Sequence, residues 1–317
     1  MQNHLEIKKY LEFVDNDVTE VRLFTNERYM KINGHREYVQ GVTSGYYDRN
    51  HQDNLIRDIE PFDGKASAIY TTIHNCKEDL MGRRFNKLEY ALNGKNDAFT
   101  KDVDIKELSI FPIDVDSDRS SGVSATDDEL EESLAKRDKI AEFFNDNDIV
   151  PVKAMSGNGY HLLIPLLHKV PVTDESKELF DRIGHILADY FGCDSTVYNL
   201  ARIWKLYGTM VCKGDNATEI GRIHRRSKID IPEQVERYDF NHLCSAIEQL
   251  ESRRTITSAV KPTPRLTPEL KDNNNDSGSH NSADIFISDN NIEVLDTSEG
   301  STMTKHCLLY TSPSPRD

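Results

Sequence analysis

The sequence predicts an α+β fold with a split βαβ core, the pattern shared by ferredoxin-like and RNA-recognition-type folds. Three observations predict it. After Glu107, apolar runs and helical periodicity alternate in the order strand, helix, strand, strand, helix, strand. Helix-start and helix-stop residues bound both helices. A glycine-containing turn, residues 156–159, separates the second and third strands as in a hairpin.

The first strand is expected at residues 108–115, an apolar run of strand length. The first helix should begin after Thr126, which forms a capping box with Glu129 three residues later. Asp127 and Asp128 add negative charge where the helix dipole is positive. An approximate apolar face then consists of Leu130, Leu134, Ile140, Phe143 and Phe144.

The remaining elements are a hairpin, a second helix and a fourth strand. The runs IVPVKAM and YHLLIPLL flank SGNG and predict the hairpin strands. The helix should begin after Thr173 as N-cap and end at Gly192 as C-cap. The run ARIWKLYG predicts the fourth strand. In this topology the first strand lies between the third and fourth, so its end should neighbour the beginnings of both.

We expect four segments along the chain. Residues 1–105 should form an N-terminal α/β subdomain that packs on the core, residues 106–253. Residues 254–306 are rich in Pro, Asn, Ser and Asp, which predicts a disordered linker to a further C-terminal module. Residues 307–317, CLLYTSPSPRD, are similar to the translation of a sequencing-library adapter, so we set them aside as an assembly artefact. The natural chain is therefore expected to continue past His306.

Composition limits the classes of function. The formal net charge of the 317 residues is -15, so the chain lacks the basic field of a DNA-coating protein, and any contact with nucleic acid must be local. The five cysteines form no CxxC pair, which argues against a zinc ribbon or a disulfide framework. No apolar run of about 18 residues and no secretory leader occur, so we expect a cytoplasmic protein without membrane contact.

The first strand ends in two carboxylates on one face. Asp114 and Asp116 are two positions apart and project together, while Val115 points to the other side. Adjacent carboxylates repel each other unless a cation neutralises them, and hard divalent cations prefer carboxylate oxygens. The topology brings a third acid, Asp194, to the same edge. Taken alone, the pair also fits an exposed acidic strand end.

Two further patterns suit phosphate groups. The turn SGNGYH places backbone amides, Ser156 and His161 beside the acids, although alone it equally fits a tight turn. Residues 193–228 concentrate positive charge in an acidic chain. The cations are Arg202, Lys205, Lys213, Arg222, Arg225, Arg226 and Lys228. They suit phosphate oxygens, but the alternative is a solvated basic face that pairs with the acidic helix at residues 126–146.

Three stretches, IDVDSDRSSGVSATDDE, SGNGYHLL and CDSTVYNLARIWKLYGTMVCKGD, resemble in order and spacing the signature motifs of the archaeo-eukaryotic primase (AEP) superfamily. The resemblance is to the primase-polymerase type of phages and plasmids, and it covers roughly residues 40–230. It implies Asp114, Asp116 and Asp194 as catalytic and metal-binding acids, and Ser156, His161, Arg202, Lys205 and Lys213 as nucleotide contacts.

The resemblance implies a DNA primase or primase-polymerase that replicates a phage, plasmid or other mobile element. It would transfer nucleotides from an NTP or dNTP to a 3′-hydroxyl on a single-stranded DNA template, with two Mg²⁺ or Mn²⁺ ions. Some relatives carry a zinc-binding insertion, but the cysteine spacing here gives no sign of one, so we expect no zinc. A fused or associated replicative helicase is implied as a partner. The chain departs from the family where Tyr207 replaces the Pro of a Pro-Gly-Thr motif. It departs again at residues 222–225, where Arg-Pro-His-Arg is common, and this leaves the role of His224 open.

Three other interpretations fit part of the pattern. A DxD glycosyltransferase also binds metal through paired acids, but no sugar-nucleotide domain precedes the motif here. A relaxase or replication initiator can share a similar sheet, yet it needs a metal-binding His-x-His pair, which this sequence lacks, and a nucleophilic tyrosine. A non-catalytic RNA-recognition-like module would not need three converging acids, and it would carry aromatic residues on its central strands.

Overall fold

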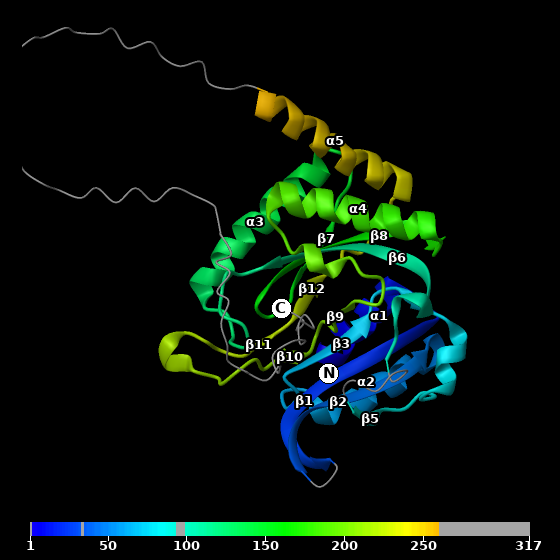
Figure 1. Ribbon diagram of the computed structural model, residues 1–317, viewed down its shortest axis with the longest axis vertical. Helices are drawn as coiled ribbons and strands as arrows, with labels where there is room; N and C mark the ends of the chain where they lie inside the picture. The colour runs from blue at the N-terminus through cyan, green and yellow to red at the C-terminus, as the bar shows by residue number, and fades with distance from the viewer. Residues whose placement is uncertain (1, 33–34, 93–98, 260–317) are drawn as a thin grey trace, which may run out of the picture. The chain divides into compact units, whose positions relative to one another are not determined.

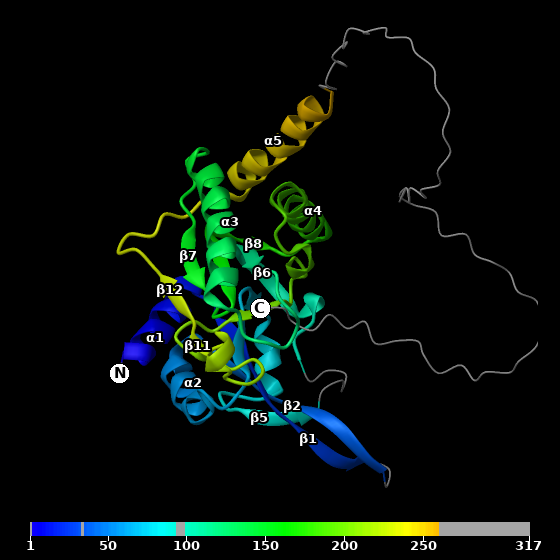
Figure 2. The same ribbon diagram turned by 90° about the vertical axis from the view of Figure 1, so that its left-hand side faces the viewer.

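The computed structural model describes residues 2–32, 35–92 and 99–259, which Figures 1 and 2 show from two sides. Within these ranges the chain forms two five-stranded antiparallel sheets and a two-stranded one, β10 (Met210–Val211) with β11 (Arg225–Arg226). The short 3-10 helices are η1 (Arg49–His51), η2 (Glu60–Phe62), η3 (Glu78–Gly82), η4 (Asp102–Asp104), η5 (Ser195–Val197) and η6 (Thr218–Ile220). The α+β class is confirmed.

The first sheet has the strand order β5-β2-β1-β3-β9. Its strands are β1 (Val18–Ile32), β2 (His35–Asp48), β3 (Ala68–Thr72), β5 (Glu89–Leu92) and β9 (Ile203–Lys205). Helix α1 (Gln2–Val14) precedes β1, and α2 (Gln52–Ile59) follows β2. The hairpin of β1 and β2 extends well beyond the other strands of this sheet (Figure 2).

The second sheet has the order β12-β7-β8-β6-β4. Its strands are β4 (Asn75–Cys76), β6 (Ile105–Asp116), β7 (Val152–Met155), β8 (Gly159–Pro171) and β12 (Lys228–Asp230). Helices α3 (Asp127–Asn145) and α4 (Asp174–Phe191) cover one face, and α5 (Phe240–Ala259) lies over α4 (Figure 1). The run from β6 through α3, β7 and β8 to α4 confirms the predicted order of the first five core elements.

The predicted position of the fourth strand is wrong. β9 forms as expected, but it pairs with β3 of the first sheet, and β4 takes the place beside β6. Of the expected pairing, one backbone bond remains, from Asp194 N–H to the Asp114 carbonyl at 3.1 Å. A run of three strand residues carries no information about its partner, and the edge of β3 satisfies its backbone groups.

The helix boundaries follow the predicted caps. The Thr126 hydroxyl accepts from the Glu129 N–H at 3.3 Å, and the Glu129 carboxylate accepts from the Thr126 N–H at 2.8 Å. Thr173 caps α4 in the same way through Ser176. Gly192 ends α4 with a φ of +69°, a conformation that glycine adopts without strain.

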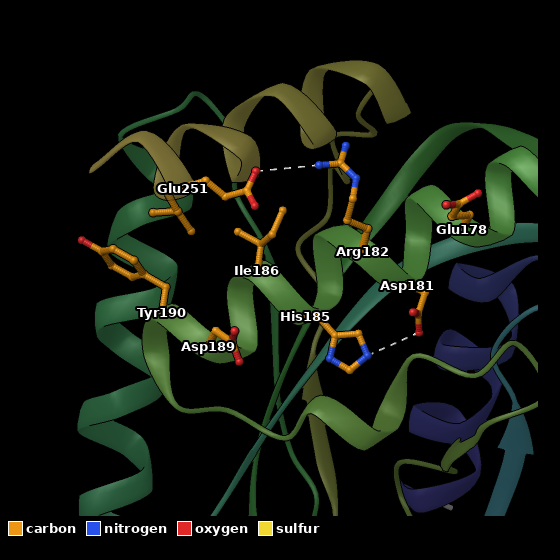
Figure 3. A pocket seen from close by; sticks show the side chains of 9 residues that line it. Glu178, Asp181, Arg182, His185, Ile186, Asp189, Tyr190 and Glu251 are labelled. Atoms are coloured by element: carbon orange, nitrogen blue, oxygen red, sulfur yellow. Dashed lines mark ion pairs between the residues drawn. The ribbon is translucent and has the colours of Figure 1, made fainter. Parts of the chain in front are cut away.

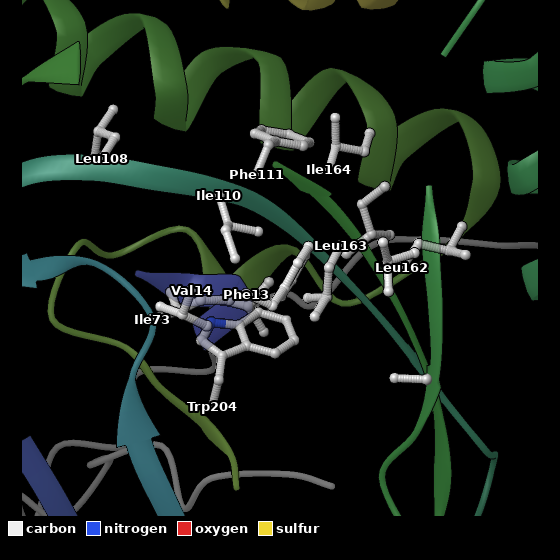
Figure 4. Close-up of a cluster of buried hydrophobic side chains, with 14 of the residues drawn as sticks. Phe13, Val14, Ile73, Leu108, Ile110, Phe111, Leu162, Leu163, Ile164 and Trp204 are labelled. Atoms are coloured by element: carbon white, nitrogen blue, oxygen red, sulfur yellow. The ribbon is translucent and has the colours of Figure 1, made fainter. Parts of the chain in front are cut away.

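The core lies on both faces of β6. Figure 4 shows Phe111 beside α4, and Ile110 on the opposite face near Trp204 and Val14. Ile110 and Phe111 are fully buried. Because strand residues alternate, Asp114 and Asp116 follow Ile110 on the face that meets the first sheet and α1. The acids are therefore placed between the two sheets and away from the helices α3 and α4.

Two predicted features lie wholly or partly outside the described residues. Helix α5 continues to Ala259, so the first residues of the predicted linker are helical. The rest of the linker, and the segment at residues 307–317, lie beyond the described ranges. The expected division at residue 105 stays a prediction, although β9 shows that the two sheets do not divide the sequence into consecutive halves. No helix in the described ranges is long and apolar enough to cross a bilayer.

Candidate active site

The carboxylate edge, our name for Asp114, Asp116 and Asp194, forms where β6 ends. Asp114 pairs with His161 of β8, and Asp116 pairs with Gly159. The turn between β7 and β8 therefore lies beside both acids, as predicted from the hairpin. The residues that the sequence placed in separate motifs become neighbours through the register of two strands.

Asp114 is buried, with 3% of its surface exposed. Its Oδ1 atom makes no hydrogen bond within the described part of the chain. The Nε2 atom of His161 lies 3.4 Å from that oxygen. Asp116 is less buried, and its Oδ1 lies 3.5 Å from the guanidinium of Arg119. A buried carboxylate oxygen without a donor is costly unless a ligand supplies positive charge.

Asp194 reaches the same edge from the segment after α4. Its Oδ1 accepts from the Thr196 N–H at 2.8 Å and so caps η5. Its Oδ2 is buried and makes no hydrogen bond to any described residue. With the backbone bond to Asp114, these contacts confirm that the third acid comes to the end of β6 although the strand after it pairs elsewhere.

Asp114 and Asp194 contribute to the raised pKa values of two neighbouring acidic side chains. Burial, followed by the neighbouring Cys193, Asp114 and Asp194, raises the pKa of Tyr198 well above its usual value. Burial, with the charge of Asp114 next, raises the pKa of Cys193 to about 12. Both neighbours therefore stay protonated at neutral pH, and neither adds further negative charge beside the acids.

The donors of the carboxylate edge suit Mg²⁺ or Mn²⁺. Buried oxygens of Asp114 and Asp194 lack hydrogen bonds, and hard cations prefer such carboxylate oxygens. Across the described ranges, no group of three or more His, Cys, Asp or Glu side chains is arranged to hold an ion by itself. In proteins, one or two carboxylates often bind magnesium together with the phosphate oxygens of a substrate.

His161 is the predicted nucleotide contact that lies nearest to the acids. It is 2% exposed, and its Nδ1 is 2.6 Å from the hydroxyl of Tyr207. Trp204 packs edge-on against the imidazole with 4.8 Å between ring centroids. Sequence reasoning missed Trp204 and Tyr207 as neighbours of His161, because β9 was expected beside β6.

Ser156 holds the turn between β7 and β8. Its Oγ accepts from the Gly159 N–H at 3.1 Å and donates to the Gly159 carbonyl at 3.2 Å. Gly157 has a φ of +110°, and a Cβ there would lie 2.6 Å from Val211. The serine therefore has a structural role in this turn, and its predicted contact with a nucleotide stays a prediction.

The three predicted cations differ in their surroundings. Arg202 follows η5, is partly exposed, and has no side-chain hydrogen bond or ion pair among the described residues. Lys205 is 1% exposed, with its Nζ 4.9 Å from the centroid of the Tyr70 ring. It follows Trp204 on β9, so it lies on the face away from His161. Lys213 lies in the loop after β10, where its carbonyl accepts from Ser124 at 3.0 Å.

The arginine cluster, our name for Arg222, Arg225 and Arg226, is paired with carboxylates. Arg222 binds Glu129 through two hydrogen bonds of 2.9 Å, and these hold the pKa of Glu129 below its usual value. Arg225 donates to Asp127 at 2.7 Å, and Arg226 donates to Asp63 at 2.7 Å. The alternative interpretation, a basic face that pairs with the acidic helix, is confirmed for Arg222 and Arg225.

His224 stabilises the loop between β10 and β11. Its Nε2 lies 3.0 Å from the Gly214 carbonyl, and its N–H donates to Asn216 at 2.8 Å. In these contacts His224 holds the loop together, which is a structural role that the sequence had left open.

Arg119 links the two motifs at the carboxylate edge. It donates to Ser117 Oγ at 2.8 Å, to the Val123 carbonyl at 3.2 Å and to the Asn158 carbonyl at 3.3 Å. Its side chain is 6% exposed and lies beside Asp116. No sequence signal assigned a role to Arg119, because its partners come from a loop and a turn that only the fold brings together.

A cavity of about 470 Å³ lies between α4 and α5, and no residue of the carboxylate edge lines it (Figure 3). Arg182 of α4 bridges to Glu251 of α5 at 3.8 Å, and His185 lies 3.6 Å from Asp181. Its lining combines these ion-paired side chains with apolar ones such as Ile186 and Leu250, and it contains none of the predicted site residues.

No protein-family profile and no curated protein sequence matches this chain. Solved structures with a similar fold include primase RepB′, at 8% identity with a TM-score of 0.41, covering 81% of this chain and 65% of that one. The chain thus spans 65% of the length of that primase.

Two catalytic domains are also similar. The catalytic domain of RepB′ in complex with initiator DNA matches at 8% identity with a TM-score of 0.39, covering 82% of this chain and 100% of that one. The AEP domain of the cyanophage S-2L primase-polymerase matches at 12% identity with a TM-score of 0.38, covering 77% and 96%. Both matches have low identity and TM-scores below 0.5.

Proposed function

We propose that this chain is the catalytic part of a DNA primase or primase-polymerase. It would transfer nucleotides from an NTP or dNTP to a 3′-hydroxyl on a single-stranded DNA template. The observation that carries the proposal is the carboxylate edge, with its buried oxygens that lack hydrogen bonds and a histidine on the adjacent strand. The order and spacing of the three sequence motifs support the same chemistry.

Asp114, Asp116 and Asp194 would hold two Mg²⁺ or Mn²⁺ ions. Such ions, when bound, ease deprotonation of the hydroxyl and stabilise the charge that develops on the α-phosphate and the departing pyrophosphate. The protein supplies position. Antiparallel pairing of β6 with β8 fixes Asp114 opposite His161, so metal ligands and a nucleotide contact are held on one rigid sheet.

Other groups of the chain would orient the triphosphate. Arg202 has a guanidinium that is not committed to any described partner, and its planar fork suits two phosphate oxygens. Arg119 holds the loop after β6 against the turn at residues 156–159, which keeps the acids and the turn in register. The arginine cluster is left out of this role because its cations are neutralised within the protein.

The wider setting is also proposed. The template would lie in a local groove of an acidic molecule and bind in a salt-sensitive way. A replicative helicase, fused or associated, would follow the linker, and the protein would serve a phage, plasmid or other mobile element in the host cytoplasm. Reading the source DNA past the codon for His306 tests the fusion, and a stop codon there would argue against it.

A primer-synthesis assay tests the activity. The full chain is incubated with labelled NTPs or dNTPs, Mg²⁺ or Mn²⁺ and single-stranded DNA, beside an Asp114→Asn/Asp116→Asn variant. Asp118→Asn is the matched control, because Asp118 is exposed two residues beyond the strand. We expect template-dependent products from the wild type and the control only. Absence of product from the wild type, or equal product from the double variant, would refute the proposal.

A further inference from the structure

His161 and Tyr207 form a short buried contact at the carboxylate edge. The Tyr207 hydroxyl lies 2.6 Å from His161 Nδ1, and both residues are at most 2% exposed. Trp204 packs edge-on against the imidazole, and Tyr10 packs edge-on against the Tyr207 ring at 5.0 Å between centroids. Because both rings are held by packing, the contact is a fixed feature of the fold.

The second ring nitrogen of His161 decides where its proton lies. Nε2 is 3.4 Å from Asp114 Oδ1, and an ionised carboxylate can only accept hydrogen bonds. A neutral imidazole has one N–H and one lone pair. If the lone pair is at Nε2, the two buried acceptors His161 Nε2 and Asp114 Oδ1 would face each other and repel. With the N–H at Nε2, the contact becomes attractive, and Nδ1 becomes an acceptor for the Tyr207 hydroxyl.

We propose that Tyr207 is a positioning residue that fixes His161 in the Nε2–H tautomer. This inference rests on the proposed function, in which His161 contacts the incoming nucleotide. In this tautomer Nε2 donates a hydrogen bond to a phosphate oxygen of a nucleoside triphosphate. It neither accepts a proton from the substrate nor ligates a metal ion. The hydroxyl of Tyr207 thus makes His161 Nε2 a hydrogen-bond donor rather than a general base or a metal ligand.

The contact between Tyr207 and His161 depends on a residue that differs from the family motif. Tyr207 stands where the resembled family often has the Pro of Pro-Gly-Thr, and proline has no side chain that can donate to an imidazole. Gly208 and Thr209 keep the rest of that motif. Tyr207 therefore brings a hydroxyl to this position, and that hydroxyl lies 2.6 Å from His161 Nδ1.

Nitrogen NMR tests the tautomer without any need for activity. The full chain, labelled with ¹⁵N-histidine and free of metal and nucleotide, is measured near pH 8, about 1.5 units above the usual histidine pKa. The His161→Gln variant assigns the signals. We expect a protonated Nε2 and an unprotonated Nδ1 for His161 in the wild type. A protonated Nδ1, alone or together with Nε2, would overturn the proposal.

Two tyrosine variants complete the test. Tyr207→Phe should mix the two tautomers, whereas Tyr10→Phe should leave them unchanged. Tyr10 is the matched control because it is equally buried and its hydroxyl bonds to Thr71 instead of His161. An unchanged spectrum for Tyr207→Phe would contradict the inference. If that variant melts early and does not fold, the wild-type spectrum still decides the result.

Kinetics separate this inference from the proposed function. In the primer assay, Tyr207→Phe should raise the nucleotide KM about tenfold with little change in kcat, the size expected for loss of an orienting contact. An unchanged KM beside a wild-type enzyme that works would refute the inference alone. A correct tautomer in a chain that makes no product would refute the proposed function alone.

Discussion

The carboxylate edge and the arginine cluster are both rich in charge, but they differ in whether their charged groups have partners within the molecule. Asp114 and Asp194 each bury an oxygen that makes no hydrogen bond within the described residues. Arg222, Arg225 and Arg226 each donate to a carboxylate of the same molecule. Charged groups with partners in the same molecule stabilise the fold, whereas a buried polar atom without a partner needs an explanation, and the one we propose is a bound ligand. The comparison therefore separates a site from a scaffold where charge alone does not.

The largest expected effect comes from Asp114→Asn. Loss of a charge at the proposed metal site should lower primer synthesis by about 10³-fold or more, as for removal of a catalytic group. The free energy of unfolding should stay equal or rise, because the change removes a buried charge of which one oxygen makes no hydrogen bond within the described residues. Primer assays and thermal melts measure the two quantities on the same sample.

Asp104→Asn is the matched change at a satisfied carboxylate. Asp104 accepts from the Lys101 N–H at 3.0 Å and from Arg83 at 3.3 Å. Its replacement should cost about 1 kcal/mol of stability and leave primer synthesis intact. If Asp114→Asn were the destabilising variant and Asp104→Asn the inactive one, the distinction between site and scaffold would fail.

A buried histidine provides a second satisfied group, and it predicts a pH dependence. Burial lowers the pKa of His74 to about 3. Above the ordinary value of about 6.5 both states are neutral, so His74 adds no pH dependence. As the pH falls from 6.5 to 3, the unfolded chain takes up the proton first. Stability should then fall by up to about 1.4 kcal/mol per pH unit.

Urea unfolding at several pH values measures this slope. His74→Gln, which has no charge at any pH, should flatten the acidic limb within that window. Primer synthesis at neutral pH should be little affected, since His74 packs on Phe180 and accepts from the N–H of Ser109, which is five residues before Asp114 on β6. An acidic limb of equal slope in the variant would show that other groups control it.

The smallest effect is expected from Arg222→Met. Arg222 and Glu129 are partly exposed, so water screens their ion pair and its loss should lower the free energy of unfolding only slightly. The nucleotide KM should not change, because the guanidinium is already neutralised. A KM that rises severalfold at equal stability would move Arg222 from the scaffold to the site, and it would weaken the comparison.

The sequence predicted what depends on local chemistry. The caps at Thr126, Thr173 and Gly192 and the turn at residues 156–159 came out as expected, because their contacts lie within a few residues. The shared face of Asp114 and Asp116 followed from strand periodicity alone. These local rules were enough to bring two of the three acids and His161 together.

Contacts between distant segments were not predictable in the same way. β9 is a three-residue strand, and nothing in its pattern distinguishes the edge of β3 from the edge of β6. Trp204 and Tyr207 reach His161 only because β9 joins the first sheet. Arg119 was missed because its partners lie in a loop and a turn. The arginine cluster looked like a phosphate site because its carboxylate partners are 93 to 163 residues away in sequence.

The central claim is that the buried oxygens of the carboxylate edge await a divalent cation. The direct test is titration of Mn²⁺ into the wild-type chain and Asp114→Asn, followed by electron paramagnetic resonance of the free ion and by thermal melting. We predict that the wild type binds Mn²⁺ and melts at a higher temperature with it, as expected for a ligand of the folded state. The variant should lose both effects. Equal binding by the two proteins, or no binding by the wild type, would contradict the account.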